Sequence, residues 1–209
     1  YYLAGRIAAQ FATNRLGFIA GFIGPETVRN INAFTRGARS VKPGLVVEVR
    51  FVGFFNDLNT VPTQTYHGAA GDKLYFREQL LTRLLIDSGC EVIAHYTNTQ
   101  RSVRLVHDLE QAGELTPGSV YTVAQGTRTA CRAGDGTNIP SCIGAVYTDW
   151  TRIYRSAMDA RARNALNSLQ PLRGSIDDTD SSQVGFVANP AGRGVDTVSV
   201  AAENQVLAR

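Results

Sequence analysis

The stretch LGFIAGFIGPETVRNINAF, residues 16–34, predicts a buried strand, a glycine-bearing turn and a helix in succession. Its first four residues form an apolar run that is typical of a strand covered on both faces. Gly21 and Gly24 allow the backbone to turn tightly, and Pro25 suits the first turn of a helix because no hydrogen bond is lost there. In an open α/β sheet, ligands bind in the crevice beyond the carboxyl end of such a strand.

The predicted helix has one apolar face and one charged start. Val28, Ile31 and Phe34 recur at three- to four-residue spacing, so we expect this face to pack back on the strand. Glu26 lies in the first turn, where the helix dipole favours negative charge. At the border of the crevice, the Glu26 carboxylate would either accept a hydrogen bond from a ligand hydroxyl or only complement the dipole.

Strand and helix predictions alternate along the rest of the chain. This alternation predicts an α/β fold, a doubly wound parallel sheet with right-handed crossovers. We expect Gly89 to end the second long helix, Asp72 to cap its start, and residues 54–71 to form a long loop. We expect further strands at residues 45–52, 91–96, 119–124 and 143–148. We expect helices at residues 3–13, 73–88, from 97 onward and at 150–169. Short elements are expected at 183–188 and 197–201.

Composition excludes several classes of protein. The 209 residues are 44% apolar and 19% charged, which is ordinary for a globular protein. The net charge of +3 is spread along the chain without a basic run and interleaved aromatics, so we expect no nucleic acid partner. No apolar run approaches the ~18 residues of a membrane span. The chain opens at Tyr1 without Met or a signal peptide, and we expect that this is not the biological start.

The cysteine pattern leaves two interpretations open. Cys131 and Cys142 flank the loop RAGDGTNIPS, and a disulfide closing it would imply an oxidising compartment. The alternative is two unrelated thiols. We expect Cys90 to be a small buried apolar residue. The spacing matches no zinc pattern, so no metal site is expected.

Catalytic motifs are missing from the sequence. It contains no GxSxG, no P-loop and no paired-histidine metal motif, and GFIAGFIG has the wrong spacing for a dinucleotide-binding turn. Asp177, Asp178 and Asp180 lie in an expected exposed loop without the further ligands of a calcium site. We therefore expect neither enzyme activity nor a cofactor.

Six segments occur in a recognisable order: YLAG at 2–5, GFI at 17–19, PETVRNINAFTRGA at 25–38, VKP at 41–43, EVIAHYTNT at 91–99 and YTDW at 147–150. This ordered set resembles the basic membrane protein family. These are the substrate-binding lipoproteins of bacterial ABC importers, several of which bind purine nucleosides.

The resemblance implies a two-lobed, periplasmic-binding-protein-like fold with the ligand in the cleft. Residues 16–145 would form one complete Rossmann-like lobe, and residues 1–15 and 146–209 part of a second lobe whose leading part is missing here. The family often carries an Asp where this chain has Gln125-Gly126. A carboxylate that would hold a ribose hydroxyl is therefore expected to be absent.

Trp150, the only tryptophan, follows a predicted strand at the start of a helix. Its ring would stack on a flat base, as base–aromatic contacts worth ~1–3 kcal/mol do. The alternative is a hinge or packing role. The resemblance favours the cleft.

Thr97 and Asn98 follow another predicted strand and open a helix. The Asn98 amide offers a donor and an acceptor, and a helix N-terminus offers free N–H groups; the alternative is a simple N-cap. His95 and Tyr96 alternate on the strand, so only one faces the cleft. A lone histidine is more often structural, which leaves Tyr96. The predicted ligand-binding set is Gly24, Glu26, Tyr96, Thr97, Asn98 and Trp150.

We therefore expect a non-enzymatic binding protein for a nucleoside-like small molecule, either an importer component that docks a membrane permease or a receptor ectodomain. It would be exported to the periplasm, the cell surface or the extracellular space. The alternative is a structural or assembly subunit on the same fold, with a degenerate cleft and a partner chain. A Rossmann-type enzyme is a third hypothesis, which bound nicotinamide or flavin would reveal.

Overall fold

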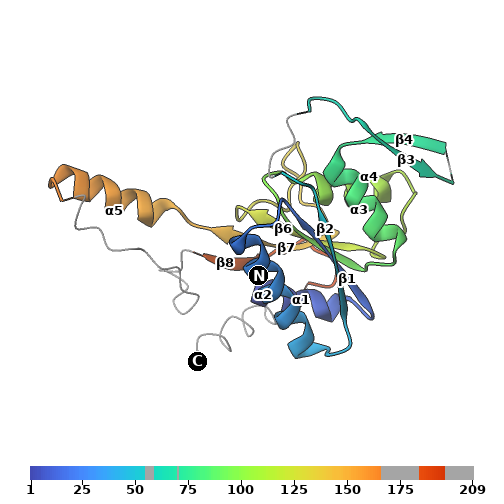
Figure 1. Cartoon of the computed structure of the whole chain (residues 1–209), viewed down its shortest axis with the longest axis horizontal. Coiled ribbons are helices and arrows are strands. Elements are labelled where there is room, and N and C mark those ends of the chain that lie inside the picture. The colour runs from blue at the N-terminus through green and yellow to red at the C-terminus, as the bar shows by residue number, and fades with distance from the viewer. Residues whose placement is uncertain (55–58, 70, 166–183, 196–209) are drawn as a thin grey trace.

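The computed structural model describes residues 1–54, 59–69, 71–165 and 184–195, and its centre is a six-stranded sheet in the order β2-β1-β5-β6-β7-β8 (Figure 1). The first five strands in this order run parallel, as predicted, while β8 pairs antiparallel with β7. The strands are β1 (Arg15–Ala20), β2 (Val46–Phe51), β5 (Val92–Tyr96), β6 (Tyr121–Gly126), β7 (Cys142–Thr148) and β8 (Val184–Ala188).

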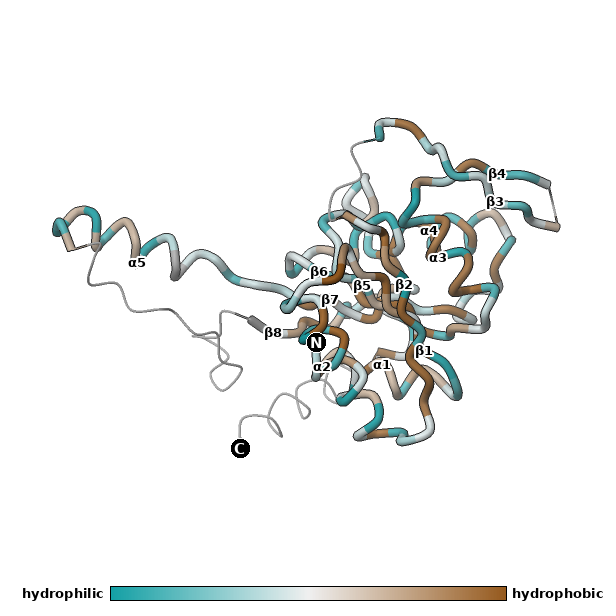
Figure 2. The backbone as a smooth tube through the Cα atoms, viewed as in Figure 1, coloured by the Kyte–Doolittle hydropathy of each residue, from teal (hydrophilic) through white to brown (hydrophobic). Residues whose placement is uncertain are grey.

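Helices cover both faces of the sheet. Helices α1 (Tyr2–Phe11) and α2 (Pro25–Val41) lie on one face, and α3 (Arg77–Asp87) and α4 (Arg101–Gln111) lie on the other (Figure 1). Successive strand residues point to opposite faces. Accordingly, Phe18 packs with Phe34 beneath α1 and α2, whereas Ile19 packs with Leu85 beneath α3. Apolar segments concentrate in the strands of the sheet (Figure 2). The doubly wound α/β prediction is confirmed.

The contact between α1 and α2 is made by backbone against backbone. A Cβ atom at Gly5 would lie 2.0 Å from the carbonyl oxygen of Phe34, and one at Gly37 would lie 1.9 Å from that of Tyr2. Only glycine permits such an approach. The prediction that Val28 belongs to the packed face of α2 is wrong, because this side chain is 41% exposed. The inward positions are taken by Thr27, Phe34, Gly37 and Ala38, with Ile31 half-buried.

Part of the segment that was expected to be a long loop forms a strand. β3 (Gln64–Gly68) pairs antiparallel with β4 (Gly71–Tyr75), and the rings of Tyr66 and Tyr75 lie 5.9 Å apart. Tyr75 is buried against α4, which anchors the hairpin. The predicted helix 73–88 is therefore wrong at its start. Asp72 pairs with His67 across the hairpin instead of capping a helix, and Leu74 is 60% exposed.

Two other helix boundaries also differ from the predictions. Helix α4 begins at Arg101 rather than at Thr97, and α5 (Thr151–Ala162) ends before the predicted residue 169. Asp149 accepts a hydrogen bond from the Thr151 N–H at 2.9 Å, which stabilises the start of α5. The predictions for residues 166–169 and 197–201, and for the acidic cluster at 177–180, lie outside the described residues.

Helix α5 extends away from the sheet and its covering helices (Figure 1). Trp150, Tyr154 and Met158 recur at four-residue spacing along it and are 53%, 64% and 71% exposed. The rings of Trp150 and Tyr154 lie 6.4 Å apart. Apolar side chains on this helix thus face outward. In the part of the chain that the structure describes, no helix has the length and apolar character that crossing a membrane requires.

Candidate functional site

The carboxyl ends of the parallel strands place the sequence-predicted site residues along one edge of the sheet. Gly24 follows β1, Tyr96 ends β5, Asn98 lies in the next loop, and Trp150 follows β7. Ligands of open α/β sheets bind at this edge. The structure therefore brings these four residues to the expected side of the sheet, with Trp150 separated from Tyr96 by the end of β6.

Gly24, Glu26 and Tyr96 link the first turn of α2 to the end of β5. Gly24 is the extended residue that precedes α2, and Glu26 is exposed in the first turn. Burial, together with the hydrogen bond to the Glu26 carboxylate and the charge of that carboxylate, raises the pKa of Tyr96 to about 12. The Tyr96 hydroxyl therefore stays protonated and donates to Glu26. That contact holds both side chains at the edge where we predicted a ligand.

His95 is buried beneath this edge and is structural, as expected for a lone histidine. Its Nδ1 lies 3.0 Å from the Thr97 hydroxyl, and its Nε2 lies 3.1 Å from Oε1 of Gln100. Burial lowers the pKa of His95, so the ring is neutral. Thr97 is itself buried, with its hydroxyl engaged by His95. This corrects the prediction that the Thr97 side chain contacts a ligand. The side chain instead stabilises the loop after β5 through its contact with His95.

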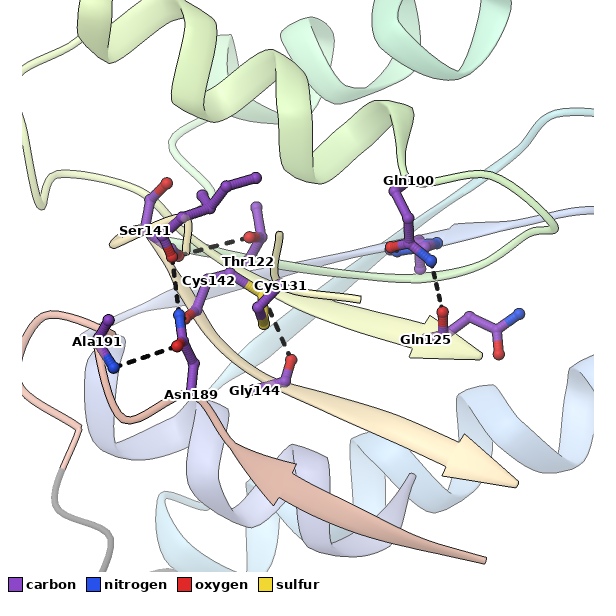
Figure 3. Close-up of a disulfide and its surroundings, with 11 residues drawn as sticks. Gln100, Thr122, Gln125, Cys131, Ser141, Cys142, Gly144, Asn189 and Ala191 are labelled. Atoms are coloured by element: carbon purple, nitrogen blue, oxygen red, sulfur yellow. Dashed lines mark hydrogen bonds between the residues drawn. A yellow bond between two sulfur atoms is a disulfide. The ribbon is translucent and has the colours of Figure 1, made fainter. Parts of the chain in front are cut away.

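Gln125 lies where, according to the resemblance, the family often carries an aspartate. Its amide donates to the backbone carbonyl of Thr97 at 2.8 Å. The amide of Gln100 donates to the backbone carbonyl of Gln125 (Figure 3). These bonds tie the end of β6 to the loop after β5. At this position the chain thus has a neutral amide that braces the edge of the sheet.

The start of α4 is occupied by a buried carboxylate that sequence reasoning missed. One oxygen of Glu78 accepts hydrogen bonds from the backbone N–H and the hydroxyl of Ser102, both at 2.9 Å, and the other accepts from the Thr99 hydroxyl at 2.6 Å. The N–H of Ser102, in the first turn of α4, is therefore not available to a ligand. Glu78 lies 24 residues earlier, on another helix, so no local pattern reveals this contact.

The hollow that contains Trp150 lies between the ends of β6 and β7. Residues 126–128 and 147–150 line a volume of about 440 Å³. The guanidinium carbon of Arg128 lies 3.9 Å from the ring centre of Tyr147, and the Trp150 ring is half exposed beside it. An accessible aromatic ring next to a few polar groups is an arrangement that can hold a flat, polar small molecule.

The charged groups of this hollow suit binding. Hydrogen bonds from the backbone N–H and the hydroxyl of Thr151 lower the pKa of Asp149, so its carboxylate is charged at neutral pH. Arg128 supplies donors and a positive charge on the other side. Among the residues that the structure describes, no three His, Cys, Asp or Glu side chains gather to hold a metal ion.

The loop after β6 is closed by a disulfide. Cys131 and Cys142 are bonded, with Cα atoms 5.5 Å apart, which confirms the first of the two interpretations. The amide of Asn189 donates to the carbonyls of Ile139 and Cys142, at 2.9 and 2.8 Å, and ties the loop to the end of β8 (Figure 3). Cys90 is buried, as predicted, and burial raises the pKa of its thiol to about 11.

Residues 1–65 match the family model described as "ABC transporter substrate-binding protein PnrA-like". The chain is 32% identical over 160 residues to a putative ABC transporter glucose-binding protein of Haloferax volcanii, covering 76% of this chain and 33% of that protein. It is 31% identical over 111 residues to a purine-binding protein of Brucella abortus, covering 51% of this chain and 26% of that protein. It is 35% identical over 78 residues to an ABC transporter nucleoside-binding protein of Lactococcus lactis, covering 35% and 22%. The chain thus spans about a third or less of the length of these relatives.

Solved structures share the fold. An ABC transporter solute-binding protein from Conexibacter woesei superposes with a TM-score of 0.63 at 18% identity, covering 99% of this chain and 59% of that one. A solute-binding protein from Aeropyrum pernix superposes with a TM-score of 0.60 at 11% identity, covering 98% and 55%. The fold is therefore the periplasmic-binding-protein-like α/β fold that the ordered segments predicted, over part of its length.

Proposed function

We propose that this chain binds a nucleoside-like small molecule as part of an ABC import system and catalyses no reaction. Its first 65 residues match the model of the PnrA-like substrate-binding family. The family match and the purine- and nucleoside-binding relatives confirm the resemblance seen in the sequence. Because the chain spans only part of these relatives, the ligand and the partners are proposals.

The observation that carries this proposal is the accessible Trp150 ring beside the hollow at the carboxyl ends of β6 and β7. A flat base would stack on this ring, and its polar edge would meet Asp149 and Arg128. Gly24, Glu26, Tyr96 and Asn98 would complete the wall along the same edge. Thr97 would act only by supporting that wall.

The second wall of the cleft would come from a second lobe. We propose that residues 16–145 form one lobe and that residues 1–15 and 146–209 contribute to the other. Support comes from α5, which leaves the sheet after Thr148 and carries Tyr154 and Met158 exposed. Helix α1 packs on α2 and β8 pairs with β7 in the central sheet, so both segments would also contact the first lobe. Closure of two lobes around a ligand is a hinge motion.

The remaining parts of the proposal concern location and partner. The disulfide between Cys131 and Cys142 supports an exported, oxidising location. In that location a closed, ligand-bound form would dock a membrane permease or signal through attached chains. The ABC transport names of the relatives support the permease.

The test is titration of the purified protein with inosine, adenosine and guanosine, followed by calorimetry and by tryptophan fluorescence. Because Trp150 is the only tryptophan, its fluorescence reports from the hollow itself. We expect one-site saturation by at least one nucleoside with a change in emission. Trp150→Ala should weaken binding roughly 10- to 100-fold, from a stacking energy of ~1–3 kcal/mol. Met158→Ala, two turns along α5 and 71% exposed, is the control and should bind normally.

A second candidate function is a structural or assembly subunit with a degenerate cleft. It is favoured by the carboxylate of Glu78 at the start of α4 and by the exposed side chains of Tyr154 and Met158. This function predicts no heat with any of the three nucleosides. It also predicts an assembly in light scattering that the double substitution Tyr154→Glu and Met158→Glu dissociates.

A further inference from the structure

A second hollow lies on the other side of Arg128, beside the disulfide. Its volume is about 130 Å³, which suits a small polyatomic ion rather than a whole nucleoside. None of its lining residues is an aspartate or a glutamate. The polar lining residues are Arg128, Thr129, Arg132, Asn138 and Asn189. A hollow with two guanidinium groups and no carboxylate favours an anion.

Arg128 is held in place by an aromatic ring. Its guanidinium lies over Tyr147, whose side chain is almost fully buried. Gly185 of β8 lies opposite Tyr147, and a Cβ atom there would come within 2.7 Å of the Tyr147 hydroxyl. The ring is thus packed against the backbone of β8 and presents its outer face to Arg128. Such stacking limits the rotamers of the arginine before any anion arrives.

The loop that carries Arg132 is also fixed. The disulfide closes it at Cys131, and Arg132 forms a β-bridge with Asn138. Asp135, the acidic residue of this loop, accepts hydrogen bonds from the N–H and hydroxyl of Thr137. Within the described ranges, neither Arg128 nor Arg132 has an ion-pair partner. The charge of Arg128 also acts on Asp149 in the neighbouring hollow and helps to lower the pKa of that carboxyl, but no salt bridge neutralises either guanidinium group among the described residues.

We propose that this hollow is an oxyanion site, in which Arg128 and Arg132 donate to a phosphate or carboxylate group. The anion could be a free inorganic ion or a substituent of the bound molecule. The second source rests on the proposed function: because Arg128 lines both hollows, a ring stacked on Trp150 could extend its anionic group past Arg128. Two experiments separate these sources.

The first experiment titrates the purified protein with inorganic phosphate by calorimetry. We expect saturable binding that Arg128→Gln and Arg132→Gln each weaken about tenfold, since charge-assisted hydrogen bonds are lost. Arg104→Gln, an exposed arginine on α4, makes the same change in net charge and should leave the affinity unchanged. Arg128→Lys keeps the charge but not the planar stack, and should weaken binding more than Arg104→Gln does. Unfolding curves of each variant show whether it is folded.

Two results of this experiment would overturn the proposal. One is the absence of phosphate binding by the folded wild-type protein. The other is an equal loss in Arg104→Gln, which would mean that only the net charge matters.

The second experiment compares inosine with inosine 5′-monophosphate. If the anionic group belongs to the ligand, the monophosphate should bind at least tenfold more tightly, and Arg128→Gln should remove that advantage. Tight binding of both ligands without an advantage for the monophosphate, together with no phosphate binding, would refute the oxyanion site and leave the proposed function intact. Arginine-dependent phosphate binding without any nucleoside binding would support the site and refute the proposed ligand class.

Discussion

The carboxylate of Glu78 and the first turn of α4 are joined by two hydrogen bonds, from the backbone N–H and the hydroxyl of Ser102, each 2.9 Å long. The helix dipole favours a negative charge at this position. In a binding protein the start of such a helix is where a ligand anion would be expected. Here the protein supplies the anion itself, and the loop after β5 is fixed as a result.

Glu78→Ala should destabilise the protein by about 3–4 kcal/mol, because it leaves buried donors at Ser102 and Thr99 without an acceptor. Glu78→Gln should cost less, since its amide oxygen can still accept one of these bonds. Denaturant unfolding measures both changes. The control is Asp108→Asn on the exposed side of α4, which we expect to stay within ~0.5 kcal/mol of the wild type. A loss of equal size in the control would contradict this interpretation of Glu78.

Gly5→Ala and Gly37→Ala should each destabilise the contact between α1 and α2 by more than about 2 kcal/mol. The added methyl group would collide with a backbone carbonyl, which cannot move aside as a flexible side chain can. Thermal unfolding measures the effect. Gly44→Ala is the matched control: a Cβ atom there meets nothing within 4 Å, so this variant should be neutral or slightly more stable. Wild-type stability in Gly5→Ala would mean that the helices cross differently.

Reduction of the disulfide between Cys131 and Cys142 should lower the free energy of unfolding by roughly 2–3 kcal/mol. The bond closes a short loop, with a sequence separation of 11, and thereby restricts the unfolded chain. Unfolding with and without reductant measures the loss, and mass measurement under non-reducing conditions checks the bond. The double variant Cys131→Ser and Cys142→Ser is the control, and it should no longer respond to reductant. If reductant still lowers the stability of the double variant, the loss does not come from this disulfide.

The carboxylate of Glu91 should make stability depend on pH in the acidic range. Burial would raise its pKa, but hydrogen bonds from the backbone N–H groups of Asn14, Arg15 and Thr13 outweigh this and lower the pKa below its usual value. A lowered pKa in the folded state contributes stability above the pKa of the unfolded chain, and this stability is lost as the pH falls through the folded value.

Glu91→Gln tests this pH dependence. At neutral pH the variant should be less stable than the wild type by about 1 kcal/mol, a figure kept small because the site is partly exposed to solvent. The difference should shrink as the pH falls below about 4.5, the usual pKa of a glutamate carboxyl. Denaturant unfolding at several pH values measures it. A difference that stays constant across this range would disprove the role of the charge.

Much of the sheet could be predicted because its strands are apolar on both faces. Leu16 to Ile19 and Val92 to Ala94 can be stable only when both faces are covered, and the intervening helices follow from that requirement. The hairpin could not be predicted in this way. Asp72 followed by a lysine and leucines imitates a capped helix, and it is the burial of Tyr75 against α4 that makes the segment a strand.

The candidate site likewise contains positions that the sequence could predict and contacts that only the folded structure reveals. The edge shared by Gly24, Asn98 and Trp150 follows from parallel strands, whose carboxyl ends all lie on one side. The inward orientation of Thr97 depends on a buried partner, His95, that only tertiary structure identifies. The carboxylate of Glu78 at α4 depends on two helices that meet far apart in sequence, so helix propensities alone could not reveal it.

Thr148 at the end of β7 is the register partner of Val184 at the start of β8. The chain therefore leaves the sheet at Thr148 and re-enters it beside the same residue, so the strand order does not fix the length of the intervening segment. Loop-closure entropy grows only slowly with length. A foreign segment grafted between Thr148 and Val184 should therefore leave the sheet assembled. Exchange of this segment offers a route to new binding specificities on the same sheet.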